Sequence, residues 1–322
     1  ANSKLTWERT QEFNIGLDFG FFRNRINGSL DVYQRTSKDL IMERQLPSTT
    51  GWTSVWDNIG KVRNTGLELS INTINVQTSD FSWQTNIIFD TNKNEILELY
   101  GGKKDDIGNK WFIGEAINVN YDYEFDGIWQ TSEADKAAIY GQTPGQVKVK
   151  DQNHDNVIDA KDKVILGQQL PKWTGSITNT FTYKNWDLAF NVYTRQGAQL
   201  NSTFVSSFMA YDGNYNQAKV DYWTETNPTN KYPQPGNKGK YFSSMCYQDV
   251  SFVRVGYITL GYTFPMSLLK PIGIKRLKLY ATANNPFLFT SFKGFDPEWA
   301  TQNTWGEATS TRTFLFGVKL AF

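Results

Sequence analysis

Histidine and cysteine are almost absent from this chain of 322 residues, which contains one of each, His154 and Cys246. A single cysteine excludes an internal disulfide and a zinc site built from cysteines. A single histidine excludes most catalytic dyads and triads and the metal sites that need several imidazole ligands. The chain therefore offers few of the side chains on which enzymes most often depend.

An excess of charge of one sign is also lacking, because 33 Lys and Arg residues are balanced by 32 Asp and Glu residues. This balance excludes the basic footprint of a nucleic-acid-binding protein. No run of about 18 apolar residues occurs, so the sequence predicts no membrane-spanning helix. No signal peptide is recognisable, and the first residue is Ala1 rather than Met.

Apolar and polar residues alternate with a period of two along much of the chain, which is the pattern of a β-strand with two different faces. About nine strands of roughly 10–12 residues are expected, and a tilted strand of that length spans a bilayer. The segments with this pattern are 13–21, 26–32, 67–71, 81–89, 177–183, 186–192, 251–264, 277–283 and 314–322.

Short and long connections between these strands alternate, which predicts an outer-membrane barrel with tight periplasmic turns and long extracellular loops. In that orientation Phe322 ends in the periplasm. The expected short connections are 22–25, 77–80, 184–185 and the slightly longer 265–275. The expected long connections are 36–60, 96–171, 198–250 and 291–311.

The apolar face of each strand is expected to meet lipid, and the polar face is expected to line a water-filled interior. A soluble β-sandwich or jelly roll is the alternative, and a mean hydropathy of −0.51 suits both classes. Nine is an awkward number, because bacterial single-chain barrels have even strand numbers and an open sheet leaves unpaired edges in lipid. Either the count is wrong by one or the chain is a piece of a larger barrel. The missing signal peptide favours a piece.

Several motifs in order give the chain a resemblance to SusC/RagA-type TonB-dependent outer-membrane transporters, specifically to the C-terminal third of their barrel. The last strand, RTFLFGVKLAF (312–322), alternates and stops on an aromatic residue, as the signal for barrel assembly does. The other motifs are NIGLDFGFF (14–22), NIGKVRNTGLEL (58–69), FDGIWQ (125–130), PGQVKVKDQNHDNVIDAKDKVILG (144–167), SFVRVGYITLGYTFP (251–265), ANNPFLFT (283–290) and KGFDPE (293–298).

The resemblance implies an all-β barrel of about 22 strands with an N-terminal plug, of which residues 1–322 would be the last nine strands. The stretches 96–171 and 198–250 would be long extracellular loops. It further implies TonB-driven import of oligosaccharides, or less often oligopeptides, across the outer membrane of a Gram-negative, Bacteroidetes-like bacterium. A SusD-like lipoprotein would form the lid. TonB would act through the plug and N-terminal part, which this chain lacks.

One stretch, DQNHDNVIDAKD (151–162), comes close to the spacing of a calcium-binding loop. Asn156 replaces the usual Gly, and the last position is one methylene shorter than the usual Glu, which should weaken binding. The flanks read as short strands instead of the helices of an EF-hand. Calcium, or hydrogen bonds of Asx-turns made by the same side chains, would hold this loop. The candidate calcium ligands are Asp151, Asn153, Asp155, Asp159, Asp162 and the carbonyl of Val157.

Aromatic residues gather in the long loops, where rings can stack on sugars or pack peptides, although rings also build loop cores. The candidate substrate-binding residues are Trp111, Trp129, Tyr222, Trp223 and Tyr241. No pair of carboxylates is placed convincingly for glycoside hydrolysis, so no catalytic residue and no organic cofactor are expected. The rival functions are a soluble or surface-attached carbohydrate-binding β-protein, with or without hydrolase activity, and a passive porin.

Overall fold

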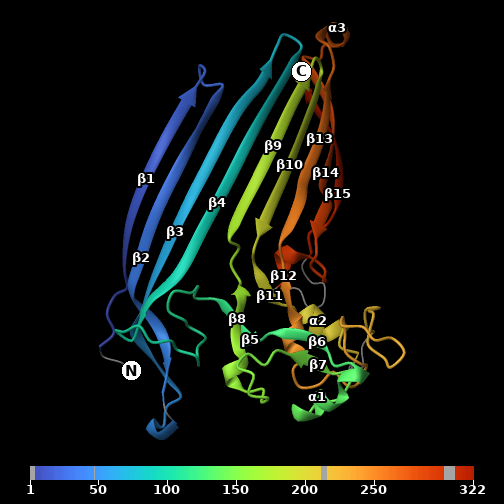
Figure 1. Ribbon diagram of the computed structural model, residues 1–322. Helices are drawn as coiled ribbons and strands as arrows, with labels where there is room; N and C mark the ends of the chain where they lie inside the picture. The colour runs from blue at the N-terminus through green and yellow to red at the C-terminus, as the bar shows by residue number, and fades with distance from the viewer. Residues whose placement is uncertain (1–3, 47, 212–215, 301–308) are drawn as a thin grey trace.

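The computed structural model describes residues 4–46, 48–211, 216–300 and 309–322. In this part of the chain, nine long strands form one sheet in the order β1-β2-β3-β4-β9-β10-β13-β14-β15. Each strand pairs antiparallel with its neighbours. Figure 1 shows the strands side by side in a tall, curved wall with the loops gathered at its lower end. The predicted number of nine strands is confirmed.

Several strands are longer than the predicted length, because pairing continues beyond the alternating segments. The bounds are β1 Arg9–Phe21, β2 Ile26–Gln45, β3 Ser54–Gln77, β4 Phe81–Leu99, β9 Trp173–Tyr183, β10 Trp186–Gln196, β13 Phe252–Thr263, β14 Arg276–Thr290 and β15 Thr313–Ala321. The expectation of a long loop over 36–60 is wrong, since β2 and β3 run on as a paired hairpin through most of that segment.

One face of the sheet is apolar from strand to strand. Directly opposed residues of an antiparallel pair share a face, and Leu17, Leu30, Leu69 and Phe89 form one such row. Along β1 the apolar side chains run from Phe13 to Phe21, roughly 27 Å at about 3.4 Å per residue. A band of about 25 Å is what a transmembrane barrel presents to lipid. Leu17 is 57% exposed and Phe316 is 84% exposed, so neither lies in a compact interior.

The opposite face carries polar and charged residues. Asp31, Glu68 and Asp90 lie opposite one another across β2, β3 and β4, and Asp90 faces Thr174 of β9. Asn191 of β10 donates to Ser176 at 2.8 Å and to Thr178 at 2.9 Å on the same face. The sheet thus has the two unlike faces that the alternating sequence predicts.

Short connections lie at the upper end of the sheet in Figure 1, where the short helix α3 (Met266–Leu269) joins β13 to β14. The longer connections lie at the other end and carry their own small elements. These are β5 Val119–Tyr123, β6 Phe125–Ile128, α1 Ala134–Ile139, β7 Val147–Val149, β8 Lys163–Gln168, β11 Gln199–Asn201, α2 Thr203–Phe208 and β12 Tyr247–Asp249. In the described residues, every helix is too short or too polar to cross a membrane.

The loop elements share a hydrophobic core that joins the two longest connections. Ile128 and Val147 from the first connection pack with Trp223 and Phe242 from the second. Cys246 lies in the same cluster, where burial raises the pKa of its thiol to about 12. This thiol is therefore protonated at neutral pH and suited to packing. The core makes the loop end a folded body that can hold a site in place.

Candidate functional site

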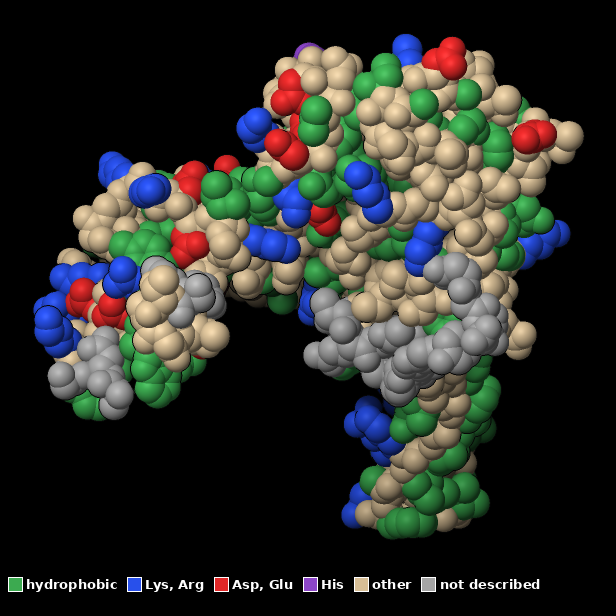
Figure 2. Space-filling model, turned by 90° about the horizontal axis from the view of Figure 1, so that it is seen from below, with side chains coloured by type: hydrophobic (Ala, Val, Ile, Leu, Met, Phe, Trp, Pro, Cys, Tyr) green, Lys and Arg blue, Asp and Glu red, His purple; other side chains and the backbone are tan. Residues whose placement is uncertain are grey.

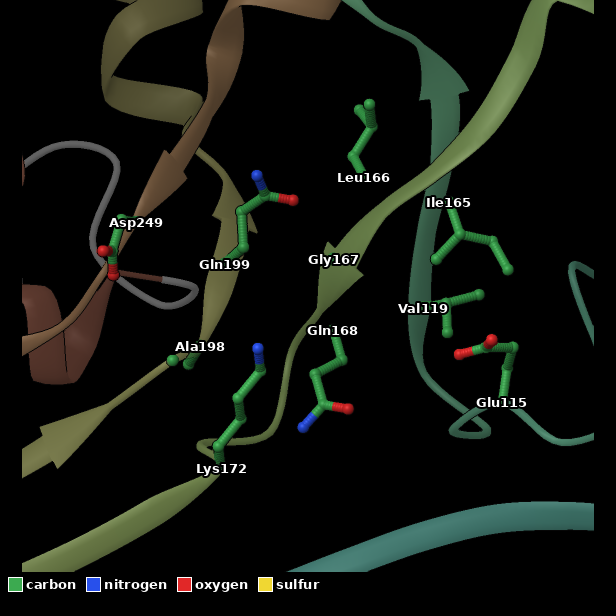
Figure 3. A pocket seen from close by; sticks show the side chains of 11 residues that line it. Glu115, Val119, Ile165, Leu166, Gly167, Gln168, Lys172, Ala198, Gln199 and Asp249 are labelled. Carbon is green, nitrogen blue, oxygen red and sulfur yellow. The ribbon is translucent and has the colours of Figure 1, made fainter.

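A pocket of about 360 Å³ lies at the loop end, between the two long connections. It is bordered by β8, by the start of β11 and by the segment that leads into β9. In Figure 3 the amine of Lys172 and the carboxylate of Glu115 reach into it from different elements. The lining residues are Glu115, Val119, Ile165, Leu166, Gly167, Gln168, Lys172, Gly197, Ala198, Gln199 and Asp249.

Two glycines leave room for polar side chains in this pocket. A Cβ atom at Gly167 would lie 2.8 Å from Oε1 of Gln199, and one at Gly197 would lie 2.8 Å from Cγ of Lys172. Gly197 also has a φ of +83°, a conformation that other residues adopt only with strain. The amide of Asn120 donates to the backbone carbonyl of Gln199 at 2.7 Å and fixes the neighbouring strand. The absence of a side chain at Gly197 therefore lets the stem of Lys172 pass close to the backbone there.

The segment that carries Lys172 leads into the polar face of the sheet. Lys172 is two residues before Thr174, which lies opposite Asp90 on the polar face. Further along that face, a second hollow of about 630 Å³ is lined by Glu12, Asn14, Asp31, Tyr33, Arg35, Asn64, Glu68 and Asn92. The polar face therefore offers hydrogen-bonding groups both near the loop pocket and across β1 to β4. This arrangement suits non-covalent binding of a hydrophilic ligand.

Three of the five aromatic residues predicted to bind substrate lie inside the loop core instead. Trp129, Trp223 and Tyr241 are 5%, 3% and 6% exposed. The indole of Trp129 donates to Gln142 and that of Trp223 to Gln130, both at 3.0 Å. Their ring faces are covered in this conformation, so they hold the loops together. Trp111 packs against a second core cluster, and Tyr222 is 36% exposed.

The Asp-rich stretch forms a compact turn closed by its own side chains. Asp151 accepts hydrogen bonds from the backbone N–H groups of His154 at 2.7 Å and Asn156 at 2.9 Å. Desolvation disfavours the charge on Asp151, but these bonds and one from Tyr140 outweigh it and lower the pKa. Asp162 is fully buried and accepts from Gln152 at 2.9 Å and Asp159 at 2.8 Å. The alternative of Asx-type hydrogen bonds is therefore realised at these residues.

The flanking strands predicted at 147–149 and 164–166 are present as β7 and β8, and they pair with β6 and β5 respectively. Asn156 has a φ of +65°, the left-handed conformation expected of the residue in place of glycine. Within the described residues, no group of three His, Cys, Asp or Glu side chains is arranged to hold a metal ion. Asn153, Asp155, Val157 and Asp159 lie in the same turn, and calcium binding stays a prediction.

A buried ion pair, which the sequence did not predict, fixes the connection between β14 and β15. Arg254 of β13 donates to Asp296 at 2.6 Å, and the two side chains are 2% and 3% exposed. Burial disfavours the charge on Asp296, but hydrogen bonds from Arg254 and from the backbone of Glu298 outweigh it and lower the pKa. Tyr193 donates to Glu298 at 2.9 Å, and Arg195 lies 3.3 Å from the same carboxylate. Arg254 and Asp296 lie in two of the motifs that carry the resemblance, SFVRVGYITLGYTFP and KGFDPE, but neither motif indicates that they pair.

Known proteins share the sequence pattern and the fold of this chain. Residues 1–286 fit the family described as TonB dependent receptor-like, beta-barrel. The chain belongs to this family.

Proteins with a similar sequence include several TonB-dependent receptors. The chain is 32% identical over 314 residues to the TonB-dependent receptor P26 of Formosa agariphila, covering 92% of this chain and 32% of that protein. It is 31% identical over 333 residues to the TonB-dependent receptor SusC of Bacteroides thetaiotaomicron, covering 100% and 32%. The chain therefore spans about a third of the length of these curated relatives.

Among solved structures, the RagAB peptide transporter superposes with a TM-score of 0.78 at 26% identity, over 98% of this chain and 36% of that one. The same assembly in its open-open state gives a TM-score of 0.74. The similarity thus includes both the strands and the long connections of this SusC/RagA-type barrel chain.

Proposed function

We propose that residues 1–322 are the C-terminal part of the barrel wall of an active outer-membrane importer that takes up oligosaccharides or oligopeptides. The observation that carries the proposal is the sheet itself, with one continuous apolar face and one polar face. The two outer edges, on β1 and β15, need pairing in lipid. Further strands of a larger barrel would provide it. By analogy with SusC and RagAB, a SusD-like lipoprotein would cap the loops and TonB would supply energy through a plug.

Between the two ligand classes, the loop pocket favours oligopeptides. Its lining carries charges of both signs, on Lys172, Glu115 and Asp249, together with the amides of Gln168 and Gln199. Peptides present charged ends and amides that such groups recognise. A neutral sugar ring gains most from a flat aromatic face, and the residues that line this pocket include none. The chemistry is binding and passage, so no residue is assigned a catalytic role.

Uptake measurements on the intact importer test this assignment. Lys172→Ala is expected to raise the half-saturating concentration of a labelled oligopeptide at least about tenfold, because a hydrogen bond to a charged group contributes roughly 1.5–3 kcal/mol. Lys104→Ala, on the same connection but outside the pocket, is the matched control and should change little. Uptake that persists without TonB would contradict active import, and equal effects of the two variants would contradict the pocket.

We also propose that the turn at 151–162 binds calcium, with rearrangement of the hydrogen bonds that now close it. Affinity in the range of roughly 10⁻⁴–10⁻³ M is expected, as for extracellular calcium modules with incomplete ligand sets. Calorimetric titration of the detergent-solubilised protein measures it, with Asp155→Asn as the variant that removes a ligand charge and keeps the turn. Absence of heat up to millimolar calcium would leave the hydrogen-bonded turn as the whole explanation.

A further inference from the structure

Basic side chains form a row on the apolar side of the sheet, just beyond the apolar band. Arg9, Lys38 and Lys61 lie directly opposite one another on β1, β2 and β3. They share a face with Val32 and Leu67, which belong to the band itself and lie six residues nearer the tight turns. Like charges that oppose one another on a sheet destabilise it unless anions compensate.

Two more basic residues lie between this row and the apolar band. Arg63 and Lys93 both contact the carboxylate of Glu95, the lysine at 2.8 Å. Asp39 pairs with Arg9 at 2.7 Å, and Glu98 lies opposite Lys61. We call the eight charged side chains the rim patch; it has five basic and three acidic members, Arg9, Lys38, Lys61, Arg63, Lys93, Asp39, Glu95 and Glu98. The patch therefore keeps positive charge after its own ion pairs are formed.

A groove of about 530 Å³ connects the rim patch with the apolar band. Val32 and Leu67 line one part of it, and Arg63 and Lys93 line another. In Figure 2, basic side chains gather at the left of the loop end, the side where β1 and β2 lie in Figure 1, with acidic ones among them. An apolar floor next to cationic groups matches a lipid with acyl chains and an anionic head.

We propose that the rim patch binds the phosphate-bearing headgroup of a lipid in the outer leaflet of the membrane. The acyl chains would lie along Val32 and Leu67, and the phosphate would accept hydrogen bonds from Arg63, Lys61 and Lys38. Arginine and lysine suit this role, because their long stems cover apolar surface while their charged ends reach the headgroup level. The inference rests on the proposed membrane location, and it assigns the patch to lipid instead of to the transported ligand.

Native mass spectrometry of the intact importer in detergent tests the proposal, with diphosphorylated lipid A and the same lipid stripped of phosphate as probes. The double variant Lys38→Gln/Lys61→Gln should lose at least about tenfold in affinity for the phosphorylated lipid, at roughly 1 kcal/mol for each basic residue at a membrane surface. The matched control, Lys270→Gln/Lys275→Gln, removes two exposed charges at the opposite end of the barrel and should bind like the unchanged protein.

A salt titration on the unchanged protein provides a second measurement that does not depend on a variant. Affinity for the phosphorylated lipid should fall as sodium chloride rises, while affinity for the stripped lipid stays constant. Equal affinity for both lipids, or equal loss in both double variants, would overturn the proposal. Displacement by free inorganic phosphate at similar concentration would show a simple anion site and overturn it as well. A protein that fails to insert into detergent or lipid would refute the importer assignment instead.

Discussion

Replacing Arg254 with alanine is expected to destabilise the docked β14–β15 connection by about 3–5 kcal/mol, because the carboxylate of Asp296 would remain buried without its partner. Asp296 is 3% exposed and also accepts from the backbone of Glu298 at 2.9 Å. The carboxylate cannot reach water without undocking the segment around 296–298. Hydrogen exchange of the backbone amides in this segment measures the loss, since it reports local opening even when the barrel as a whole stays folded.

Arg35→Ala is the control, because Arg35 and Glu12 pair at 2.7 Å with 54% and 36% of their side chains exposed. An exposed pair contributes at most about 1 kcal/mol. Replacing both buried partners, as Arg254→Met with Asp296→Leu, should recover most of the protection lost in Arg254→Ala, since no buried charge is left alone. Unchanged exchange in Arg254→Ala would show that the ion pair does not hold the connection.

Acid should weaken the same docking. The folded-state pKa of Asp296 lies below its ordinary value, so its ionised form contributes stability that is fully present above the unfolded pKa of about 3.9. That contribution is lost as pH falls through the lower folded-state pKa. Hydrogen-exchange protection at 296–298 should therefore be constant near neutral pH and decline only in strongly acidic solution.

The sequence predicted the membrane-spanning part of the sheet better than its loop end, for a physical reason. Alternation is visible only where one face of a strand meets lipid and the other meets water, as at Phe13–Phe21. Beyond the alternating segments, β2 and β3 mix polar and apolar residues on each face, so their pairing left no periodic signal. There Leu40 and Val62 pack in the second core cluster with Ile96 and Trp111. Such a contact depends on distant residues and cannot be read from the local pattern.

The candidate site shows the same division between local and distant interactions. The turn at 151–162 is built from side chains that bond to their own neighbourhood, so its geometry followed from spacing. Trp223 donates to Gln130 across 93 residues. The aromatic content of the long loops alone could not distinguish a ring that binds a ligand from one that fills the loop core. Arg254 and Asp296 are 42 residues apart, which is why their pairing emerged only from the fold.

The second large effect concerns which face of the sheet meets hydrocarbon. Ala283 of β14 lies on the apolar face opposite Ile258 and Phe314, and Ala189 of β10 lies on the polar face opposite Thr259 and Thr180. Thr259 is also opposed to Thr282, the neighbour of Ala283, so the two alanines are at nearly the same depth. Ala283→Lys puts a charge on the face that meets lipid and should cost about 2–4 kcal/mol of barrel stability, and Ala189→Lys should cost about 1 kcal/mol or less.

Denaturant titration of the intact importer in lipid vesicles measures both variants under one condition. The substitution is identical and the depth is matched, so the difference between the two free energies of unfolding isolates the environment of each face. In a soluble sandwich the order of the two costs would be the same, because the apolar face would be a packed interior that excludes lysine and the polar face would lie in bulk water. Detergent dependence separates these cases: a lysine at position 283 that is costly in vesicles, in a protein that aggregates without detergent, requires hydrocarbon against that face.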